Sequence, residues 1–136
     1  MNREIKFRGK LVNSKEWAEG NLCIRIDDTY IITPDDTILG KYGKVFKNTI
    51  GQYTGLHDEN GKEIYEGDIV KITNKSSKVI PIKPLIAQIV WSEEYLAYIL
   101  ITTSVKDAFE NLGDYIDYDI EVIGNVFENP ELLGGE

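Results

Sequence analysis

The stretch Gly51-Gln52-Tyr53-Thr54-Gly55-Leu56, continued by Asn60-Gly61-Lys62-Glu63-Ile64-Tyr65-Glu66-Gly67-Asp68-Ile69-Val70, indicates the fold class of this chain. Asn-Gly between two segments of strand character is the strongest short-range signal for a hairpin turn that requires positive φ. Gly67 permits a sharp bend before the next strand, and Asp68 can accept hydrogen bonds from nearby backbone donors. We therefore predict a β-rich region whose structural turn residues are Asn60, Gly61, Gly67 and Asp68.

Strand patterns continue on both sides of this stretch. Residues 5–11 alternate apolar with basic or small side chains, which is typical of a half-buried strand. Residues 85–91 and 95–101 flank Ser92-Glu93-Glu94 and carry the largest apolar load, so we predict a core hairpin with Trp91 inside the core. The predicted fold is mainly β: a small barrel-like or strongly bent antiparallel sheet with an N-terminal strand region.

One short helix is expected in the second half of the chain. Ser104 can cap residues 105–111, and Gly113 can end the segment. A chain of 136 residues corresponds most simply to one domain, which buries roughly two thirds of its unfolded surface. We expect a single domain over residues 1–136, divided into a variable N-terminal strand region, residues 1–48, and a signature-bearing β core, residues 49–136.

Cysteine usage and hydropathy indicate the compartment. Cys23 is the single cysteine, so one chain can form neither an internal disulfide nor a cysteine-rich zinc site. Residues 1–10 contain four basic side chains and no apolar run of signal-peptide length. No apolar stretch approaches the roughly 20 residues that span a bilayer. We expect a cytoplasmic protein with no membrane partner.

The net charge of −8 is distributed unevenly along the chain. Residues 1–48 hold nine Lys and Arg against seven Asp and Glu, whereas residues 49–136 hold six against sixteen. Residues 107–136 contain nine carboxylates and no Lys or Arg. Such a surface repels phosphate backbones, which disfavours general nucleic-acid binding. The acidic segment is interpreted either as a solvated surface or as a docking face for a basic protein partner.

Motifs that carry chemistry are absent from the sequence. His57 is the single histidine, so a His-rich metal site is excluded and a hydrolytic triad would have to use it. Gly51-Gln52-Tyr53-Thr54-Gly55 lacks the terminal Lys-Ser/Thr of a phosphate-binding loop, and a calcium loop centred on Gly61 would put Leu56 in place of its first carboxylate. We predict no catalytic residue, no metal and no cofactor. One alternative stays open, a magnesium site made by carboxylates near Asp68, namely Asp58, Glu63, Glu66 and Asp68.

Two groups of residues are candidates for binding. Aromatic rings on a small β module can stack bases or grip a peptide, although the same rings also bury themselves across hairpins. The candidate partner-binding residues are Gln52, Tyr53, His57 and Tyr65. A candidate basic patch for nucleic acid consists of Arg3, Lys6, Arg8 and Lys10.

Two further segments near the end complete a recognisable signature. They are Glu121-Val122-Ile123-Gly124-Asn125 and Glu128-Asn129-Pro130-Glu131-Leu132-Leu133. Together with residues 49–72, they make the chain resemble the YopX family of small phage and prophage proteins. The resemblance implies a β-rich protein that acts in a bacterial host cell and self-associates as a homo-oligomer, and it brings no catalytic residues to carry over.

Three functional hypotheses follow, in descending order. The first is a non-enzymatic phage accessory module that binds a host or phage protein or assembles with itself. The second is a nucleic-acid-binding module that uses the basic N-terminal strand. The third is a metal-dependent enzyme with carboxylates near Asp68, so that an enzyme is the less favoured class.

Overall fold

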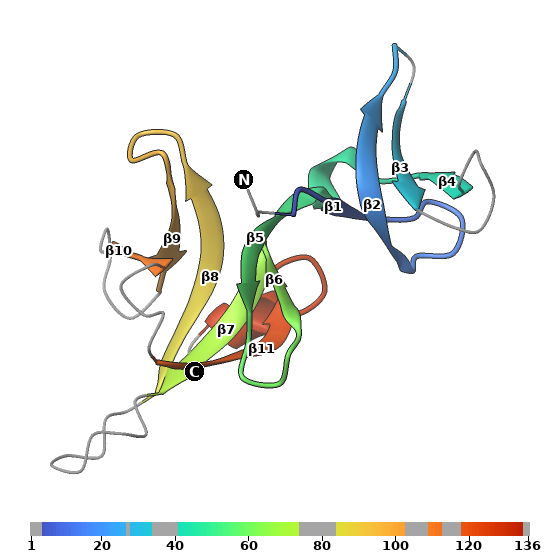
Figure 1. Ribbon diagram of the computed structural model, residues 1–136. Coiled ribbons are helices and arrows are strands. Elements are labelled where there is room, and N and C mark those ends of the chain that lie inside the picture. The colour runs from blue at the N-terminus through green and yellow to red at the C-terminus, as the bar shows by residue number, and fades with distance from the viewer. Residues whose placement is uncertain are drawn as a thin grey trace, which may run out of the picture. The chain divides into compact units, whose positions relative to one another are not determined.

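The computed structural model describes residues 4–26, 28–33, 41–73, 84–102, 109–112 and 118–134. The chain forms two compact units, Met1–Gly55 and Leu56–Glu136 (Figure 1). The sequence suggested a border between residues 48 and 49, whereas the units meet inside the signature stretch, within one strand. Each unit is described separately below.

The first unit is an antiparallel sheet that begins with three sequential hairpin-connected strands. Neighbouring strands lie in the order β4-β3-β2-β1-β5, and a 3-10 turn, η1, precedes the last strand in the chain. The bounds are β1 Phe7–Lys10, β2 Trp17–Ile24, β3 Thr29–Thr33, β4 Lys41–Lys44, η1 Lys47–Thr49 and β5 Gly51–His57, of which the last two residues belong to the second unit.

The predicted alternation of β1 positions a small apolar core in this unit. Ala18, Ile31 and Val45 are buried, and Phe7 packs against them. Gly9 is required there because a Cβ at this position would lie 2.9 Å from the Cβ of Val45. The opposite face of β1 carries its basic side chains, as expected from a period of two.

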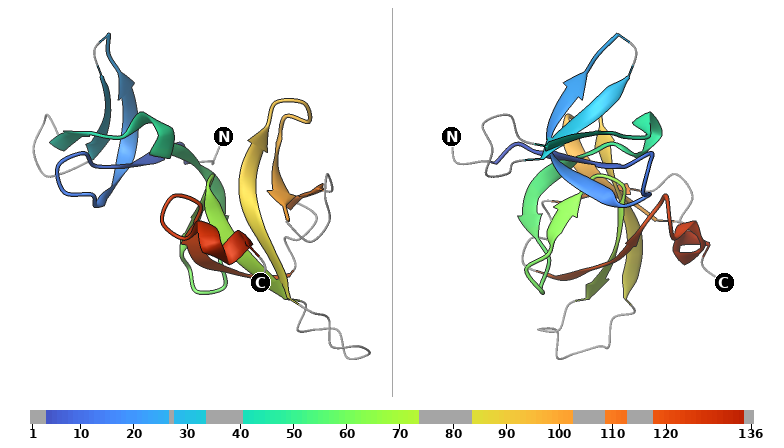
Figure 2. Two further views of the ribbon diagram at one scale, coloured as in Figure 1. Left: turned by 180° about the vertical axis from the view of Figure 1, so that it is seen from behind. Right: turned by 90° about the vertical axis from the view of Figure 1, so that its right-hand side faces the viewer.

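The second unit contains a five-stranded antiparallel sheet in the order β10-β9-β8-β7-β11, and β6 lies beside β5 (Figure 2). The bounds are β6 Glu63–Tyr65, β7 Asp68–Thr73, β8 Leu85–Ser92, β9 Ala97–Ile101, β10 Phe109–Asn111, β11 Asp119–Asn125 and the 3-10 turn η3 Pro130–Leu133. Its core consists of Ile64, Val70, Ile72, Ala87, Ile89, Leu100, Leu112 and Ile120. Each fully buried Ile, Leu or Val contributes roughly 1.5–3 kcal/mol, which makes this cluster the main source of stability in the unit.

The mainly antiparallel β class is confirmed, and both sheets are open in the described part of the chain and are not closed into a barrel. The core hairpin expected around Ser92-Glu93-Glu94 is formed by β8 and β9. The expected helix over residues 105–111 is wrong at its end, because Phe109–Asn111 is strand β10, while residues 105–108 lie outside the described residues. Pairing with β9 outweighs the local capping signal there. In the described residues, no helix is long and apolar enough to cross a membrane.

Candidate functional site

The carboxylate of Asp58 joins the signature turn to strand β11. Its Oδ1 accepts hydrogen bonds from the backbone N–H groups of Asn60 at 2.9 Å and Lys62 at 2.8 Å. Its Oδ2 accepts a third from the N–H of Val122 at 3.0 Å, from a residue 64 positions away in the sequence. One side chain therefore both closes the turn and holds it against a distant strand.

The same turn covers the outer edge of β11. The N–H of Glu59 donates to the carbonyl of Ile120 at 2.8 Å, next to the bond between Asp58 and Val122. Alternate residues of a strand direct their N–H and C=O groups to the same edge. Asp58 and Glu59 thus take the place of a further strand, which protects this edge from pairing with another chain.

The electrostatics of Asp58 fit this structural role. Burial raises the pKa of the carboxyl, but the backbone N–H groups of Val122, Lys62 and Asn60, together with the charge of Lys62, outweigh it and bring the pKa below its ordinary value of 3.8. The residue is 7% exposed. Its carboxylate is ionised and committed to backbone donors, and it is not poised for proton transfer.

The predicted turn around Asn60 and Gly61 is present, with one difference in type. The N–H of Asp58 donates to the carbonyl of Lys62 at 2.7 Å, and the N–H of Gly61 donates to the carbonyl of Asp58 at 3.0 Å. Gly61 has φ +82°, while Asn60 is not among the described non-glycine residues with positive φ. A three-residue loop ending in a left-handed glycine is a common hairpin connection and explains the requirement for Gly61.

Gly67 and Asp68 form the second signature turn. Asp68 is 1% exposed, and its Oδ2 accepts the N–H of Tyr65 at 2.8 Å. Gly67 has φ +94°, its N–H donates to the carbonyl of Ile89 at 2.8 Å, and its carbonyl accepts the N–H of Val126 at 2.9 Å. This turn ties the start of β7 to β8 and to the end of β11.

The late signature segments build a third turn at the end of β11. The N–H of Asn129 donates to the carbonyl of Asn125 at 2.8 Å, and the Oδ1 of Asn125 accepts the N–H groups of Phe127 at 3.0 Å and Glu128 at 2.9 Å. A Cβ on Gly124 would lie 2.6 Å from the Oδ1 of Asn129. The signature residues are therefore explained by backbone hydrogen bonding and close packing.

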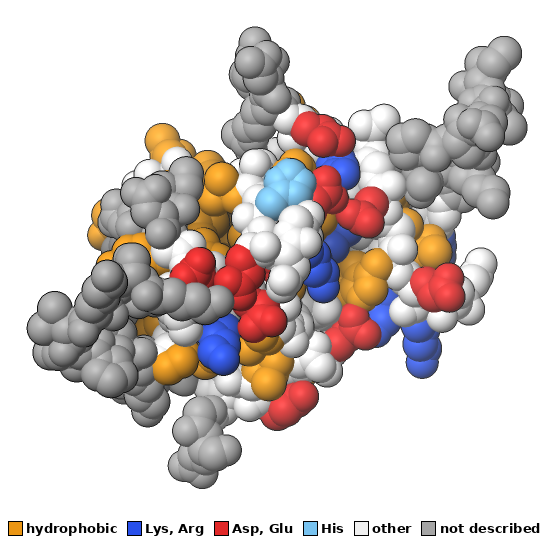
Figure 3. All heavy atoms as spheres, turned by 60° about the horizontal axis from the view of Figure 1, so that its bottom comes forward, with side chains coloured by type: hydrophobic (Ala, Val, Ile, Leu, Met, Phe, Trp, Pro, Cys, Tyr) orange, Lys and Arg blue, Asp and Glu red, His pale blue; other side chains and the backbone are white. Residues whose placement is uncertain are grey.

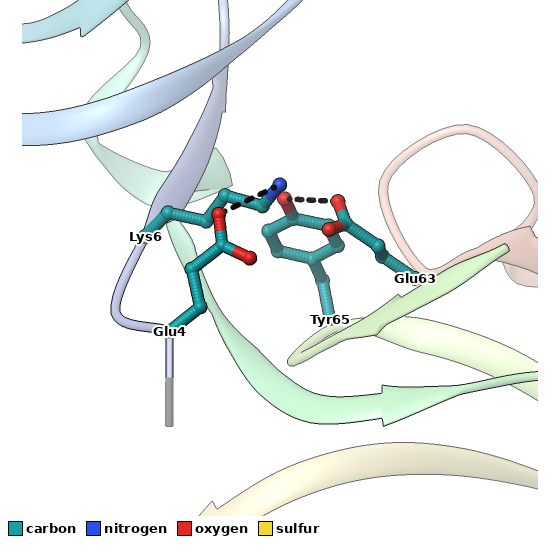
Figure 4. A network of polar contacts seen from close by, with 4 residues as sticks. All are labelled: Glu4, Lys6, Glu63 and Tyr65. Atoms are coloured by element: carbon teal, nitrogen blue, oxygen red, sulfur yellow. Dashed lines mark hydrogen bonds and ion pairs between the residues drawn. The ribbon is translucent and has the colours of Figure 1, made fainter. Parts of the chain in front are cut away.

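The carboxylates of the magnesium hypothesis do not form a ligand set. Asp58 and Asp68 accept backbone hydrogen bonds, and the Oε1 of Glu63 accepts the hydroxyl of Tyr65 at 3.1 Å (Figure 4). Within the described ranges, which include all four carboxylates, no group of three or more His, Cys, Asp or Glu side chains could hold a metal ion.

The candidate partner-binding residues differ in exposure. Tyr53 is 3% exposed and Tyr65 is 2% exposed, so their rings offer no stacking surface. Gln52 is half-buried, and His57 is exposed at the surface (Figure 3). Two of these four side chains can reach a partner, and they belong to different units.

The basic strand packs its cations against aromatic rings of the first unit. The ammonium of Lys6 lies 5.5 Å from the ring centroid of Tyr53 and 3.5 Å from the carboxylate of Glu4 (Figure 4). The guanidinium of Arg8 lies 4.8 Å from the ring centroid of Trp17.

Exposure along this strand does not suit phosphate binding. Arg8 is 8% exposed, Lys10 is half-buried, and Arg3 lies outside the described residues. A guanidinium that is buried on an indole cannot contact a nucleic-acid backbone, so the described part of the predicted patch is not a basic surface.

A different surface is found at the end of the β8–β9 hairpin, and we call residues 91–96 the hairpin tip. β7 pairs with β8 only through residues 85–88, whereas β9 pairs with β8 up to Ser92. The tip therefore extends past β7. Trp91 is 40% exposed, Tyr95 52% and Leu96 75%. Large apolar side chains that lie together on a surface mark a contact site.

The prediction that Trp91 lies in the core is wrong, because β7 does not reach far enough to cover it. The backbone of the tip is also unusual: Leu96 has φ +51°, and the N–H of Tyr95 donates to the Oγ of Ser92 at 3.2 Å. One sequence signal could have found this site, since the turn between the strands contains neither Gly nor Asn and carries Tyr95 and Leu96 instead.

Comparisons with known proteins agree with the fold. A family model described as YopX protein matches residues 6–134. The crystal structure of protein EF1440 from Enterococcus faecalis is similar, with a TM-score of 0.60 and 25% sequence identity, over 97% of this chain and 99% of that chain. No curated protein matches. Both similarities extend through both compact units.

Proposed function

Because the chain belongs to the YopX family, we propose that it is a non-enzymatic accessory protein of a phage or prophage that binds another protein in the cytoplasm of a bacterial host. The contact surface in this proposal is the hairpin tip, residues 91–96. Self-assembly through the same surface is the alternative form of the proposal.

The observation that carries the proposal is the conformation and exposure of Leu96. A non-glycine residue in the left-handed region costs roughly 1–2 kcal/mol, and Gly or Asn would serve this turn at lower cost. Leu96 is also 75% exposed, so its side chain gains little from burial within the chain. A strained, exposed leucine beside Trp91 and Tyr95 is accounted for by a contact with another molecule.

The roles of the signature residues support a binding function over catalysis. The carboxylates of Asp58 and Asp68 accept backbone hydrogen bonds that shape turns. The burial of Arg8 removes support from the nucleic-acid hypothesis. The exposed aromatic tip favours a protein partner, since Tyr and Trp are enriched at protein interfaces.

The experiment is affinity capture from a lysate of the native host, with and without nuclease, using three forms of the chain. These are the wild type, the tip variant Tyr95→Ser/Leu96→Asn, and a control, Ile24→Ser, which changes an apolar residue that is 70% exposed in the other unit. We expect a stoichiometric, nuclease-resistant protein with the wild type and the control, and its loss with the tip variant. Equal capture by the tip variant, or capture that disappears with nuclease, would contradict the proposal.

Self-assembly is tested with the same three forms. Sedimentation velocity over a range of concentrations should give one species for the tip variant, whatever the wild type does. A wild-type oligomer that the tip variant abolishes would make the partner a second copy of this chain.

A further inference from the structure

Acidic side chains flank the aromatic rings of the hairpin tip. Glu93 and Glu94 are both exposed, and neither forms an ion pair with any described residue. The turn therefore holds two carboxylates beside Trp91 and Tyr95 at the end of an acidic chain. A binder of neutral apolar surfaces alone gains nothing from charges at this position, and a phosphate backbone is repelled by them.

The Trp91 ring is arranged to accept a further contact. Tyr98 meets it edge-on, with ring centroids 5.1 Å apart and an interplanar angle of 69°. This contact fixes the orientation of the indole, yet Trp91 remains 40% exposed. Indole is the best aromatic surface for a cation, because its face carries the negative end of the ring quadrupole.

The first unit already contains this type of contact. There the guanidinium of Arg8 lies 4.8 Å from the Trp17 centroid, and the ammonium of Lys6 lies 5.5 Å from the Tyr53 centroid. In the hairpin tip an indole is present without a cation over it in the described residues, and two carboxylates lie in the adjoining turn.

We propose that the hairpin tip binds a lysine- or arginine-containing segment of a partner protein, with a cationic side chain on the Trp91 indole and a neighbouring one paired with Glu93 or Glu94. This inference rests on the proposed function and names the chemistry of its partner. Leu96 and Tyr95 supply apolar contacts for the aliphatic stems of the same side chains, which cover apolar surface well.

The experiment uses the full chain and two synthetic hexapeptides, hexa-arginine and its uncharged analogue hexa-citrulline. Backbone and indole N–H signals are followed by NMR, with the Trp91 indole assigned from Trp91→Phe. We expect hexa-arginine to shift the Trp91 indole and the amides of residues 93–97 in a saturable manner. The shifts should weaken with added salt, and hexa-citrulline should leave these signals unchanged.

Matched charge variants test whether the effect is local. Glu94→Gln should weaken binding by about two- to fivefold, as expected for one partly exposed ion pair. Glu131→Gln removes the same charge from an exposed residue elsewhere in the second unit and should leave the affinity unchanged.

Equal shifts with hexa-citrulline, equal effects of the two glutamine variants, or shifts outside the tip would overturn this inference. Shifts that depend on protein concentration without peptide would assign the surface to a second copy. If the tip variant abolishes capture from lysate while both peptides behave alike, the proposed function stands and only the cationic partner is rejected. If the tip variant captures normally, the proposed function itself fails.

Discussion

Replacing Asp58 should separate the two parts of the second unit that it joins. The carboxylate holds the turn through the N–H groups of Asn60 and Lys62 and holds β11 through the N–H of Val122. Asp58→Ala removes all three acceptor contacts. Asp58→Asn keeps one carbonyl oxygen for the turn but places an amide NH₂, a donor, where the Val122 N–H needs an acceptor.

The expected loss follows from the surroundings of each donor. Asn60 and Lys62 are exposed, so their N–H groups can turn to water, and each lost bond costs about 0.5–1.5 kcal/mol. Val122 is partly buried, and an unsatisfied N–H there costs about 1–3 kcal/mol. Asp58→Ala should therefore destabilise the second unit by about 3 kcal/mol, and Asp58→Asn by about 1–2 kcal/mol.

The assay is urea unfolding followed by Trp91 fluorescence in a Trp17→Phe background, so that the signal reports the second unit alone. The control is Glu59→Ala, which keeps the backbone bond to Ile120 and should change stability by less than about 0.5 kcal/mol. A loss below about 1 kcal/mol for Asp58→Ala, or a wild-type midpoint for Asp58→Asn, would refute the assigned role.

Three other predictions follow from the same structure. The folded-state pKa of Asp58 lies below its ordinary value of 3.8, so the stabilisation from this carboxylate is complete above that pH and is lost as the pH falls through the lowered pKa; the urea midpoint of the wild type should fall more than that of Asp58→Asn between pH 7 and pH 3. Gly124→Ala should cost about 1–3 kcal/mol, because the new Cβ meets the side chain of Asn129; an unchanged melting temperature would contradict the close packing. Leu96→Asn should keep or raise the stability by up to about 1 kcal/mol, because Asn tolerates the left-handed backbone; a clear fall in melting temperature would show that Leu96 serves the fold.

Turns were the most predictable part of the fold. Gly61 and Gly67 have the positive φ that their sequence context predicts, and the flanking strands form as expected. The expected helix over residues 105–111 shows the limit of such reasoning, since Phe109–Asn111 pairs with β9. A capping signal describes a local preference, and strand pairing between distant segments outweighs it.

The candidate site was less predictable than the fold. The rings of Tyr53 and Tyr65 look like binding residues in the sequence but are buried, and Trp91 looks like a core residue but is exposed. Aromatic side chains suit both environments, so their identity cannot decide between them. For Trp91 the decision depends on where β7 ends relative to β8.

The sequence by itself determined the β class, the signature turns and the acidic character of the second half, because φ preferences, side-chain alternation and charge are properties of single residues and near neighbours. Only the tertiary structure decided that Asp58 would hold β11 and that the hairpin tip would stay exposed. Both depend on contacts across long separations, such as the bond from Val122 to Asp58. The register of strands far apart in the chain sets those contacts, and it is decided by the packing of the whole unit.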